Sequence, residues 1–564
     1  MTERDTQHYA LRLTTLAPVH IGTGQDIDAT RYVVDDGRLF ELDPLAMMSL
    51  LNAGQRQALE QCCDDVPLLE DGGDRKRQAA QVQRAFVRLQ RFFHEHRETL
   101  KSAARDVRPI TPQFERYYRD KLGIGTKPNE RARLEVAATL TSPLTQQPVI
   151  PGSTLKGVLR TAITNLGARA QSQALEKQRV DRNKKARMIE QGLLNYDDKH
   201  IDQDPFAGIK LADAMTSRAL PRQILFAQQV SRKTPDEANA RDSRNSFYKN
   251  HVPLEVIPPF AVRAFDTRLT VRRDFLEKRG GKGDRQLAEL TLEQVFVAQN
   301  RFALPQLEAE LARLERQDVH QGCYCAPETS WITLMRRLLR ELESPLREGR
   351  AALMRLGHYA GAESKTWDGL RDIDVSLGKR RKFSDTPSTA WLATPSPRQG
   401  QFGLPLGWVL VENADEPLNL SALEPLKATS VGWAAEFDAC RDELAELRAA
   451  RKEAQARQRQ QEAELAEMER AQREKAERME RLTPAGRAVE ALREKLANDQ
   501  RFKISDVSGE LRTLLNQAVA KVVEEGDPEL KTETRELFSA CCQLWGVDRK
   551  KNKKLKELWK PLNE

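Results

Sequence analysis

The sequence predicts an α+β fold with helical insertions, followed by a long helix and an all-α C-terminal domain. Two observations carry most of this prediction. In the first 43 residues, runs with the two-residue alternation of strands are separated by glycine-containing turns. Residues 433–482, in contrast, contain neither proline nor glycine and consist largely of strong helix formers.

The N-terminal segment predicts strand, glycine loop, hairpin and helix in that order. Residues 9–19, YALRLTTLAPV, alternate apolar and polar side chains as a half-buried strand does, and run into HIGTG at 20–24. The glycines there allow a tight turn with exposed backbone N–H groups. Residues 31–43 predict a hairpin around an Asp-Gly turn, and Asp43 followed by Pro44 predicts a helix start.

The middle of the chain alternates between helical and β-rich segments. Two long stretches predict helices, 75–122 and 286–350, while residues 168–200 are so polar that they predict an exposed helix or a mobile loop. Further strands are predicted within 133–140, 204–214, 221–230, 251–271 and 402–412. The sequence GGKGD at 280–284 lacks the spacing of a phosphate-binding loop and predicts a flexible turn.

The tail predicts a solvated helix and then a helical bundle. Apolar residues in 433–482 are too sparse for a continuous coiled-coil seam, so we expect a long exposed helix or a weak coiled coil. Thr483 followed by Pro484 predicts the start of the next helix. Two or three further helices follow, the last of them strongly basic.

Composition limits the classes of protein that the chain can belong to. Its 564 residues are 39% hydrophobic and 31% charged, with a net charge of +8, which permits a polyanionic partner without requiring one. The absence of a long apolar run and the charged N-terminus predict a cytoplasmic protein that does not contact membranes. The seven cysteines lack zinc-site spacing, so we expect reduced thiols, no metal and no cofactor.

The segment VIPGSTLKGVLRTAI at 149–163 is the strongest candidate for a binding site. In a helix that begins near Ser153 or Thr154, Lys156 and Arg160 share one face, and leucines share another. The first-turn N–H groups, two hydroxyls and two cations would then surround one anion. An ordinary capped amphipathic helix with both cations in solvent explains the same residues equally well.

Other polar residues give weaker signals. His20 beside the first glycine loop could act as a base or contact phosphate, but a lone histidine in this setting more often stiffens the loop by hydrogen bonding. His94 and His96 lie two apart on a predicted helix and point in different directions, which makes a poor metal pair. Asp26 and Asp28 have no third carboxylate nearby in sequence, so loop solvation explains them better than a metal.

Five of these segments occur in an order that resembles the RAMP superfamily of CRISPR effector subunits. They are HIGTG, IPGSTLKGVLRTAI, DPFAGIKLADA, GHYAGAESKT and GWVLVE, and the resemblance covers about residues 8–415. It is closest to the subunit that caps the 3′ end of the guide RNA in the type III-A, Csm-type, effector complex. The most specific element is I-P-G-S-[ST]-x-K-G-x-[LI]-R.

The resemblance implies two ferredoxin-like, RRM-related units, which would span 1–215 and 216–415. The linker and the long solvated helix or weak coiled coil at 416–482, and the helical domain at 483–564, lie outside it. It also implies that glycine loops and a basic helix hold the backbone of the guide RNA (crRNA). Carried over to this sequence, the RNA-binding residues would be Gly22, Thr23, Gly24, Gly152, Ser153, Thr154, Lys156, Arg160, Gly357, His358, Tyr359, Gly361 and Lys365.

The resemblance further implies partners and argues against catalysis. The partners would be a backbone RAMP subunit, a small subunit and host nucleases that trim the guide. RAMP subunits that cut target RNA carry I-D-x-P-V after the first loop, whereas this chain places Thr30 where the proline is expected after Asp28. We therefore expect no catalytic residues. Two alternatives stay open: an endoribonuclease that processes precursor RNA with His20 or His358, and another RAMP subunit of a related type III complex.

Overall fold

The computed structural model describes most of the chain. The described residues are 6–64, 75–123, 134–176, 182–197, 203–216, 218–239, 247–273, 289–317, 322–323, 326–377, 380–397, 403–419, 421, 423–500 and 507–564. They divide into two compact units, Met1–Arg451 and Lys452–Glu564, which we call unit 1 and unit 2. The GGKGD turn predicted at 280–284 lies outside the described residues.

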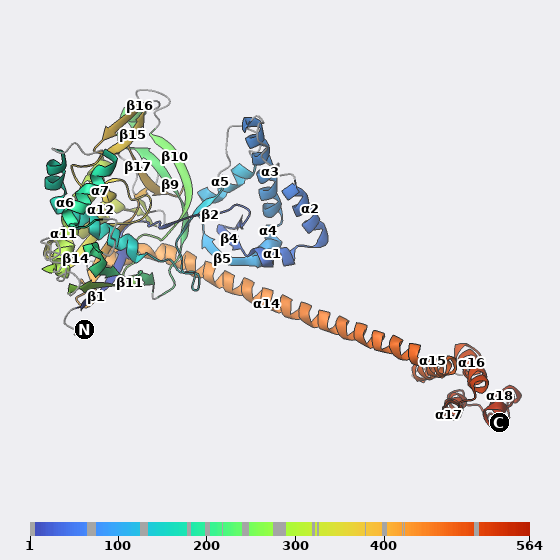
Figure 1. Cartoon of the computed structure of the whole chain (residues 1–564). Coiled ribbons are helices and arrows are strands. Elements are labelled where there is room, and N and C mark those ends of the chain that lie inside the picture. The colour runs from blue at the N-terminus through green and yellow to red at the C-terminus, as the bar shows by residue number, and fades with distance from the viewer. Residues whose placement is uncertain are drawn as a thin grey trace. The chain divides into compact units, whose positions relative to one another are not determined.

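The first sheet of unit 1 is antiparallel, with the strand order β14-β19-β1-β11-β7. Its strands β1, β11 and β14 are labelled in Figure 1. Its strands are β1 (Thr6–Thr15), β7 (Ile209–Leu211), β11 (Phe265–Arg272), β14 (Ala351–Arg355) and β19 (Trp408–Asn413), and β8 (Met215–Thr216) pairs with β11. Helix α6 (Gly152–Glu176) lies between β1 and β7 in sequence, and α11 (Leu292–Gln317) lies between β11 and β19. The elements β1, α6, β7, β11, α11 and β19 thus form one βαββαβ motif, the ferredoxin-like arrangement that was expected.

The second sheet has the order β18-β17-β9-β10-β6-β2 and places β2 at an edge. Its strands are β2 (Gly22–Ile27), β6 (Val136–Thr139), β9 (Gln223–Ser231), β10 (Tyr248–Val256), β17 (Thr389–Thr394) and β18 (Leu404–Pro405). Strands β6 and β10 pair in parallel, whereas β10 with β9, β17 with β9, β17 with β18 and β2 with β6 pair antiparallel. Both sheets draw strands from either side of residue 215, so the boundary predicted there does not follow sheet membership.

A smaller sheet and several helices fill the region between β2 and β6. The hairpin of β3 (Tyr32–Asp35) and β4 (Arg38–Leu42) forms as predicted, and β5 (Ala104–Pro109) adds a third strand. The helices are α1 (Pro44–Leu50), α2 (Ala53–Asp64), α3 (Arg75–Glu95), α4 (Arg97–Leu100) and α5 (Pro112–Gly123). Asp43 caps α1 as predicted, because its Oδ1 accepts the N–H of Leu45 at 2.9 Å.

Strand β5 corrects the expectation that residues 75–122 are helical throughout. The segment ARDVRP places Val107 in the core between two charged neighbours, and every second side chain of such a segment faces one side of a sheet. Pairing with β4 therefore outweighs the helical pattern on either side. The polar stretch 168–200 resolves in favour of helix, since α6 continues to Glu176 and α7 spans Arg182–Leu194.

The region after α11 is mainly helical as predicted, although a pair of short antiparallel strands interrupts it, and its helices pack on the first sheet. Helices α12 (Trp331–Glu341) and α13 (Glu343–Glu348) follow the short strands β12 (Gly322–Cys323) and β13 (Ala326–Ser330). Trp331 is fully buried, and its Nε1 donates to the carbonyl of Leu16 at 2.8 Å. The remaining short elements of unit 1 are α8 (Pro235–Asn239), β15 (Ile373–Leu377) and β16 (Arg380–Ser384).

Unit 1 extends past residue 415, because the next segment packs into its core. Leu423 and Leu426 are buried, and helix α14 (Glu424–Arg481) continues the packing with Trp433. The Nε1 of Trp433 donates to the carbonyl of Pro259 at 3.1 Å. The structure therefore places the division after Arg451 rather than at 415.

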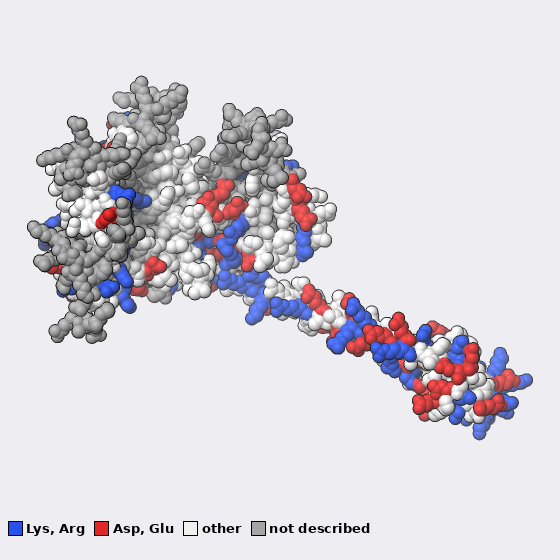
Figure 2. All heavy atoms as spheres, viewed as in Figure 1, with Lys and Arg blue, Asp and Glu red and all other residues white. Residues whose placement is uncertain are grey.

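Unit 2 contains the exposed part of α14 and a helical domain with its own core. From residue 452 the helix is exposed, and acidic and basic side chains alternate along it (Figure 2), with pairs such as Arg470 and Glu474. The other helices are α15 (Pro484–Asp499), α16 (Glu510–Glu525), α17 (Pro528–Leu544) and α18 (Lys553–Trp559). Thr483 caps α15 as predicted. Within the described residues, no helix combines the length and apolar composition that crossing a membrane requires.

A buried ion network joins the small sheet to the second sheet. Arg108 lies at its centre: its Nη2 is 2.6 Å from Glu41 and 3.2 Å from Asp106, and its Nε binds Glu255. Arg222 binds Glu255 at 2.8 Å and also binds Asp106. Burial raises the pKa of Glu41, but the neighbouring Arg108 outweighs it, so the pKa is lowered. We call these five residues the central ion network.

Candidate RNA-binding groove

Three segments far apart in sequence meet at one groove of about 480 Å³, which we call the glycine groove. They are the start of β2, the first turns of α6, and the loop after β14. Of the thirteen residues predicted from sequence, seven line the groove: Gly22, Gly24, Ser153, Thr154, Gly357, His358 and Lys365. The prediction that these segments form one site is therefore consistent with their positions in the fold.

The first segment is exposed because β2 is an edge strand with an irregular register. The pairing of β2 with β6 shifts between Gly22 and Asp26, which lifts the residues between them away from regular pairing. Gly24 has a φ of +74° and open space around its Cα, so backbone conformation alone requires glycine there. Thr23 holds the segment in place, since its Oγ1 accepts the N–H of Gln25 at 3.0 Å.

The start of α6 differs from the expected anion site. A Cβ on Gly152 would lie 2.0 Å from the carbonyl oxygen of Leu211, so this glycine serves close packing of the helix on β7. Its N–H donates to Asp213 at 2.8 Å, and the N–H of Thr154 donates to Pro151 at 2.9 Å. The protein itself thus uses first-turn amides that the sequence suggested for a ligand, while the side chains of Ser153 and Thr154 line the groove.

Lys156 and Arg160 share a face of α6 as predicted, but that face does not line the groove. Arg160 binds Glu190 and, at 2.5 Å, Asp204, and its guanidinium lies 4.9 Å from the ring centre of Phe206. Two carboxylates therefore neutralise its charge inside the protein. Burial lowers the pKa of Lys156 on the same flank.

The periodicity of α6 explains this outcome. Leu155 and Leu159 are buried in the core, which leaves one flank of the helix on either side of them. The flank with Gly157 and Thr161 faces the groove, and the other flank holds the two cations. Sequence periodicity identified the apolar face and the face with the two cations, but it could not show that a third face lines the groove.

The third segment is locked to the first one through His20. A Cβ on Gly357 would lie 2.2 Å from the His20 carbonyl oxygen, and the N–H of His358 donates to that oxygen at 3.2 Å. His20 is buried, its Nδ1 is 2.7 Å from the carbonyl of Glu255, and burial lowers its pKa. It therefore connects the groove to the central ion network, in keeping with the structural role that we favoured.

Two predicted residues of this loop support the fold instead of lining the groove. The ring of Tyr359 lies 5.8 Å from that of His20 and 4.9 Å from that of Trp391. Gly361 has a φ of +84° beside the carboxylate of Glu363, so its glycine identity follows from backbone conformation. Both residues shape the loop that presents His358 and Lys365.

Two cations line the groove, and sequence reasoning found only one of them. Lys365 is exposed and has no carboxylate partner among the described residues; its Nζ lies 3.3 Å from the His358 carbonyl oxygen. Desolvation by its surroundings and the nearby Arg355 lower the pKa of Lys365. Arg355, which was not predicted, is held by Glu310 at 3.1 Å and lies 5.2 Å from the ring centre of Trp408.

Gly157 was also missed. It lies inside α6, where glycine is unfavourable relative to alanine, yet no atom of the protein comes within 4 Å of the position of a Cβ. Internal packing therefore does not explain it. A glycine inside a helix, beyond the first turn, is itself a signal of close backbone approach, and this signal could have identified the residue from sequence.

The groove offers non-covalent binding chemistry. Hydroxyls, exposed backbone and two cations surround it, and the described residues contain no cluster of three metal-ligating side chains. Asp28 is engaged within its own loop, because its Oδ1 accepts the Thr30 N–H at 2.8 Å and the Thr30 hydroxyl at 2.6 Å. This set of groups suits an extended anion such as a phosphate chain.

Comparison with known proteins gives the family. Residues 12–295 match the RAMP superfamily. No curated protein matches the chain. A solved chain of a Csm-crRNA-target RNA ternary complex of a type III-A CRISPR-Cas system is 15% identical, with a TM-score of 0.41, covering 72% of this chain and all of that one. Csm5 of T. onnurineus is 15% identical, with a TM-score of 0.38, covering 71% of this chain and 99% of that one. Because the family match spans half of the sequence, the chain belongs to the RAMP superfamily.

Proposed function

We propose that the glycine groove holds the sugar-phosphate backbone of a guide RNA. The observation that carries this proposal is the meeting of three glycine-containing segments, from residues 22–24, 153–157 and 357–365, at one groove with two cations. Phosphate contacts from lysine, arginine, hydroxyls and backbone amides position RNA without reading its sequence. A subunit that holds guides of many sequences requires this kind of contact.

We further propose that the chain is a non-catalytic subunit that caps the crRNA 3′ end and the backbone filament of a type III-A effector complex. Membership of the RAMP superfamily and the order of the five motifs support this role. Its partners would be the guide RNA, a backbone RAMP subunit, a small subunit and host nucleases that mature the guide. Such an assembly would act in the cytoplasm in antiviral defence.

A lysine variant tests the RNA-binding proposal. Lys365→Ala should weaken binding of labelled single-stranded RNA and reduce the slope of log affinity against log salt by about 0.7, the value for one lost phosphate contact. Fluorescence anisotropy over a series of salt concentrations measures both quantities. Lys427→Ala is the control, because Lys427 is exposed and pairs with Glu424 away from the groove.

An unchanged salt slope for Lys365→Ala would show that the groove does not hold RNA. The same RNA should stay at full length during the measurement. Site-specific cleavage that His358→Ala abolishes would instead support the endoribonuclease alternative, because His358 is an exposed imidazole in the groove.

Gly157 gives a test in which stability and binding change in opposite directions. Gly157→Ala should stabilise the protein by about 1 kcal/mol, because alanine is the better helix former and the Cβ meets no protein atom. The same Cβ projects into the groove, so RNA affinity should fall by about threefold or more. Thermal unfolding and anisotropy report the two effects. Gly54→Ala on α2 is the control, and unchanged RNA affinity in Gly157→Ala would contradict the close approach.

A further inference from the structure

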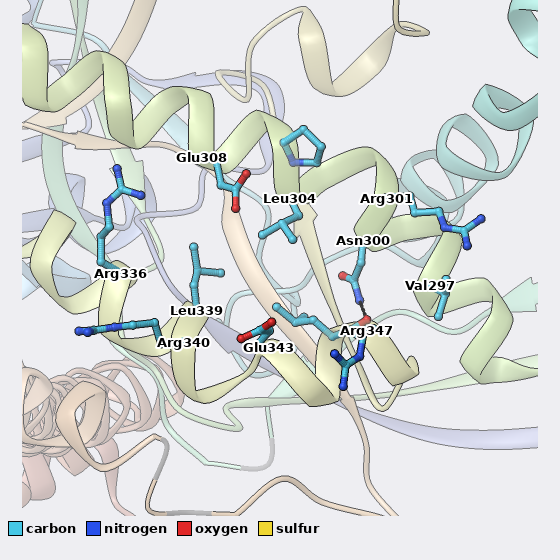
Figure 3. Close-up of a pocket in the computed structure, with 12 residues that line it drawn as sticks. Val297, Asn300, Arg301, Leu304, Glu308, Arg336, Leu339, Arg340, Glu343 and Arg347 are labelled. Carbon is cyan, nitrogen blue, oxygen red and sulfur yellow. Dashed lines mark hydrogen bonds between the residues drawn. The ribbon is translucent and has the colours of Figure 1, made fainter.

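A second groove lies between α11 and the pair α12–α13, with a volume of about 1040 Å³ (Figure 3). We call it the arginine groove. It shares no lining residue with the glycine groove. Its floor is apolar: Leu304 of α11 and Leu339 of α12 point into the space between the helices, and Val297, Pro305 and Leu346 continue the surface along it.

The rim of the arginine groove carries an excess of positive charge. Arg301, Arg336, Arg340 and Arg347 line it together with only two carboxylates, those of Glu308 and Glu343. Arg336 is paired with Glu315 at 2.9 Å. In the part of the chain that the structure describes, the other three arginines form no salt bridge with a carboxylate, although Arg347 lies close enough to Glu348 to help lower the pKa of that carboxyl. Arginines that border an apolar surface are typical centres of binding energy in protein interfaces.

The backbone adds a polar group to the same surface. Pro305 lies inside α11 and has no N–H, so the carbonyl of Arg301, one turn earlier, loses its helical donor. Both residues line the groove. Asn300 fixes the width of the groove, because its Nδ2 donates to the carbonyls of Leu346 at 2.8 Å and Ala351 at 2.7 Å. The groove is therefore a built surface between tied helices.

We propose that the arginine groove binds an amphipathic helix of a partner protein whose apolar face is flanked by acidic side chains. The lining from Val297 to Glu308 follows α11 for twelve residues, about 16 Å or three helical turns. A helix of that length presents apolar residues at i, i+3, i+4 and i+7 to such a floor. Its carboxylates would meet Arg301, Arg340 and Arg347.

Charge and apolarity together favour this occupant over RNA. Phosphates would find partners in the arginines, but the apolar floor offers them none, and Glu308 and Glu343 would repel them. A helix with acidic flanks pairs its carboxylates with the arginines of the rim and also buries the apolar floor. The inference is independent of the RNA proposed for the glycine groove, and the two can fail separately.

A synthetic peptide of about 15 residues tests the proposal on the full chain, with leucines at the i, i+3, i+4 and i+7 positions and glutamates on both flanks. We expect saturable binding by anisotropy, weakened about tenfold in the variant that combines Arg340→Glu with Arg347→Glu. Arg337→Glu is the matched control, because Arg337 is exposed on the same helix, pairs with Glu341 and lies outside the groove.

Peptide variants separate the contribution of the acidic side chains from that of the apolar face without changing the protein. Replacing the glutamates by glutamine, or the leucines by serine, should each weaken binding. Equal binding by the serine peptide, or displacement of the parent peptide by single-stranded RNA, would identify a general polyanion site and overturn the proposal. Light scattering tests whether the chain dimerises through the same arginines. If dimerisation blocks peptide binding, a second copy of the chain occupies the groove, and the proposal of a partner helix is also overturned.

Discussion

A chain that ends after residue 451 should retain a folded unit 1, whereas a chain that ends after residue 415 should not fold. The shorter chain lacks Leu418, Leu423, Leu426 and Trp433, which are 4%, 0%, 1% and 6% exposed. Burial of each such side chain contributes about 1.5–3 kcal/mol, so the four together contribute about 6–12 kcal/mol. That sum is comparable to the whole stability of a typical domain, about 5–15 kcal/mol.

Circular dichroism melts and size-exclusion chromatography distinguish the two outcomes. The 451 chain should unfold cooperatively and elute as a compact species, while the 415 chain should aggregate or show no transition. A chain that ends after residue 482 is the control, since residues 452–480 are almost entirely exposed and should leave the melting temperature of unit 1 unchanged. Cooperative melting of the 415 chain at the same temperature would contradict the packing described for α14.

Arg108→Met should destabilise unit 1 by about 3–5 kcal/mol, because it leaves Glu41, Glu255 and Asp106 buried without their central cation. Methionine keeps much of the side-chain volume, so the loss reports charge more than packing. Urea unfolding at pH 7 measures it. Arg119→Met is the control: Arg119 is exposed and pairs with Glu115, and exposed pairs contribute about 1 kcal/mol or less.

The loss of unfolding free energy caused by Arg108→Met should also depend on pH in a defined direction. In the parent protein the pKa values of Glu41 and Asp106 are lowered, since the attraction of the neighbouring arginines outweighs the effect of burial. The stability that these carboxylates contribute is present above their unfolded pKa of about 4 and is lost as the pH falls through the lowered values. Without Arg108, both pKa values should rise relative to the parent protein, because only Arg105 beside Glu41 and Arg222 beside Asp106 then oppose the effect of burial.

The difference in unfolding free energy between the parent and Arg108→Met should therefore be largest near neutral pH and shrink as the pH falls towards about 4. Urea titrations at several pH values test this. A difference that stays constant across the range would mean that Arg108 stabilises the fold by packing and not by charge.

Local structure was largely predictable from the sequence. The Asp-Gly hairpin, the Asp43 cap, the helix that begins at Gly152 and the exposed helix after residue 452 all follow from short-range rules, and the α+β class is confirmed. Strand β5 was missed, because its pairing with β4 joins residues more than sixty positions apart. The helical periodicity of the residues on both sides of β5 gives no indication of this pairing.

The candidate site was predictable in position but not in chemistry. Residues 22–24, 153–154 and 357–365, which motif order grouped as one site, contribute to one groove, and their role in binding stays a prediction. The same motifs assigned Arg160 to the ligand, although Glu190 and Asp204 bind it. These carboxylates lie on α7 and in the turn before β7, so the sequence of α6 alone could not predict that they pair with Arg160. Arg355 was missed for the same reason, since only the folded strand places it beside Lys365.

The position of β1 in the first sheet also sets an order for folding during synthesis. Strand β1 is synthesised first, but it pairs with β11 and β19, which end at Arg272 and Asn413. At about 5–20 residues per second, the ribosome needs roughly 20–80 s to deliver the second neighbour. The adjoining strands β2, β6, β9 and β10 are complete by Val256, so the core of the second sheet can assemble first. Until β19 is synthesised, one edge of β1 has no partner strand. During that time the edge is open to pairing with strands of other chains, which is a route to aggregation.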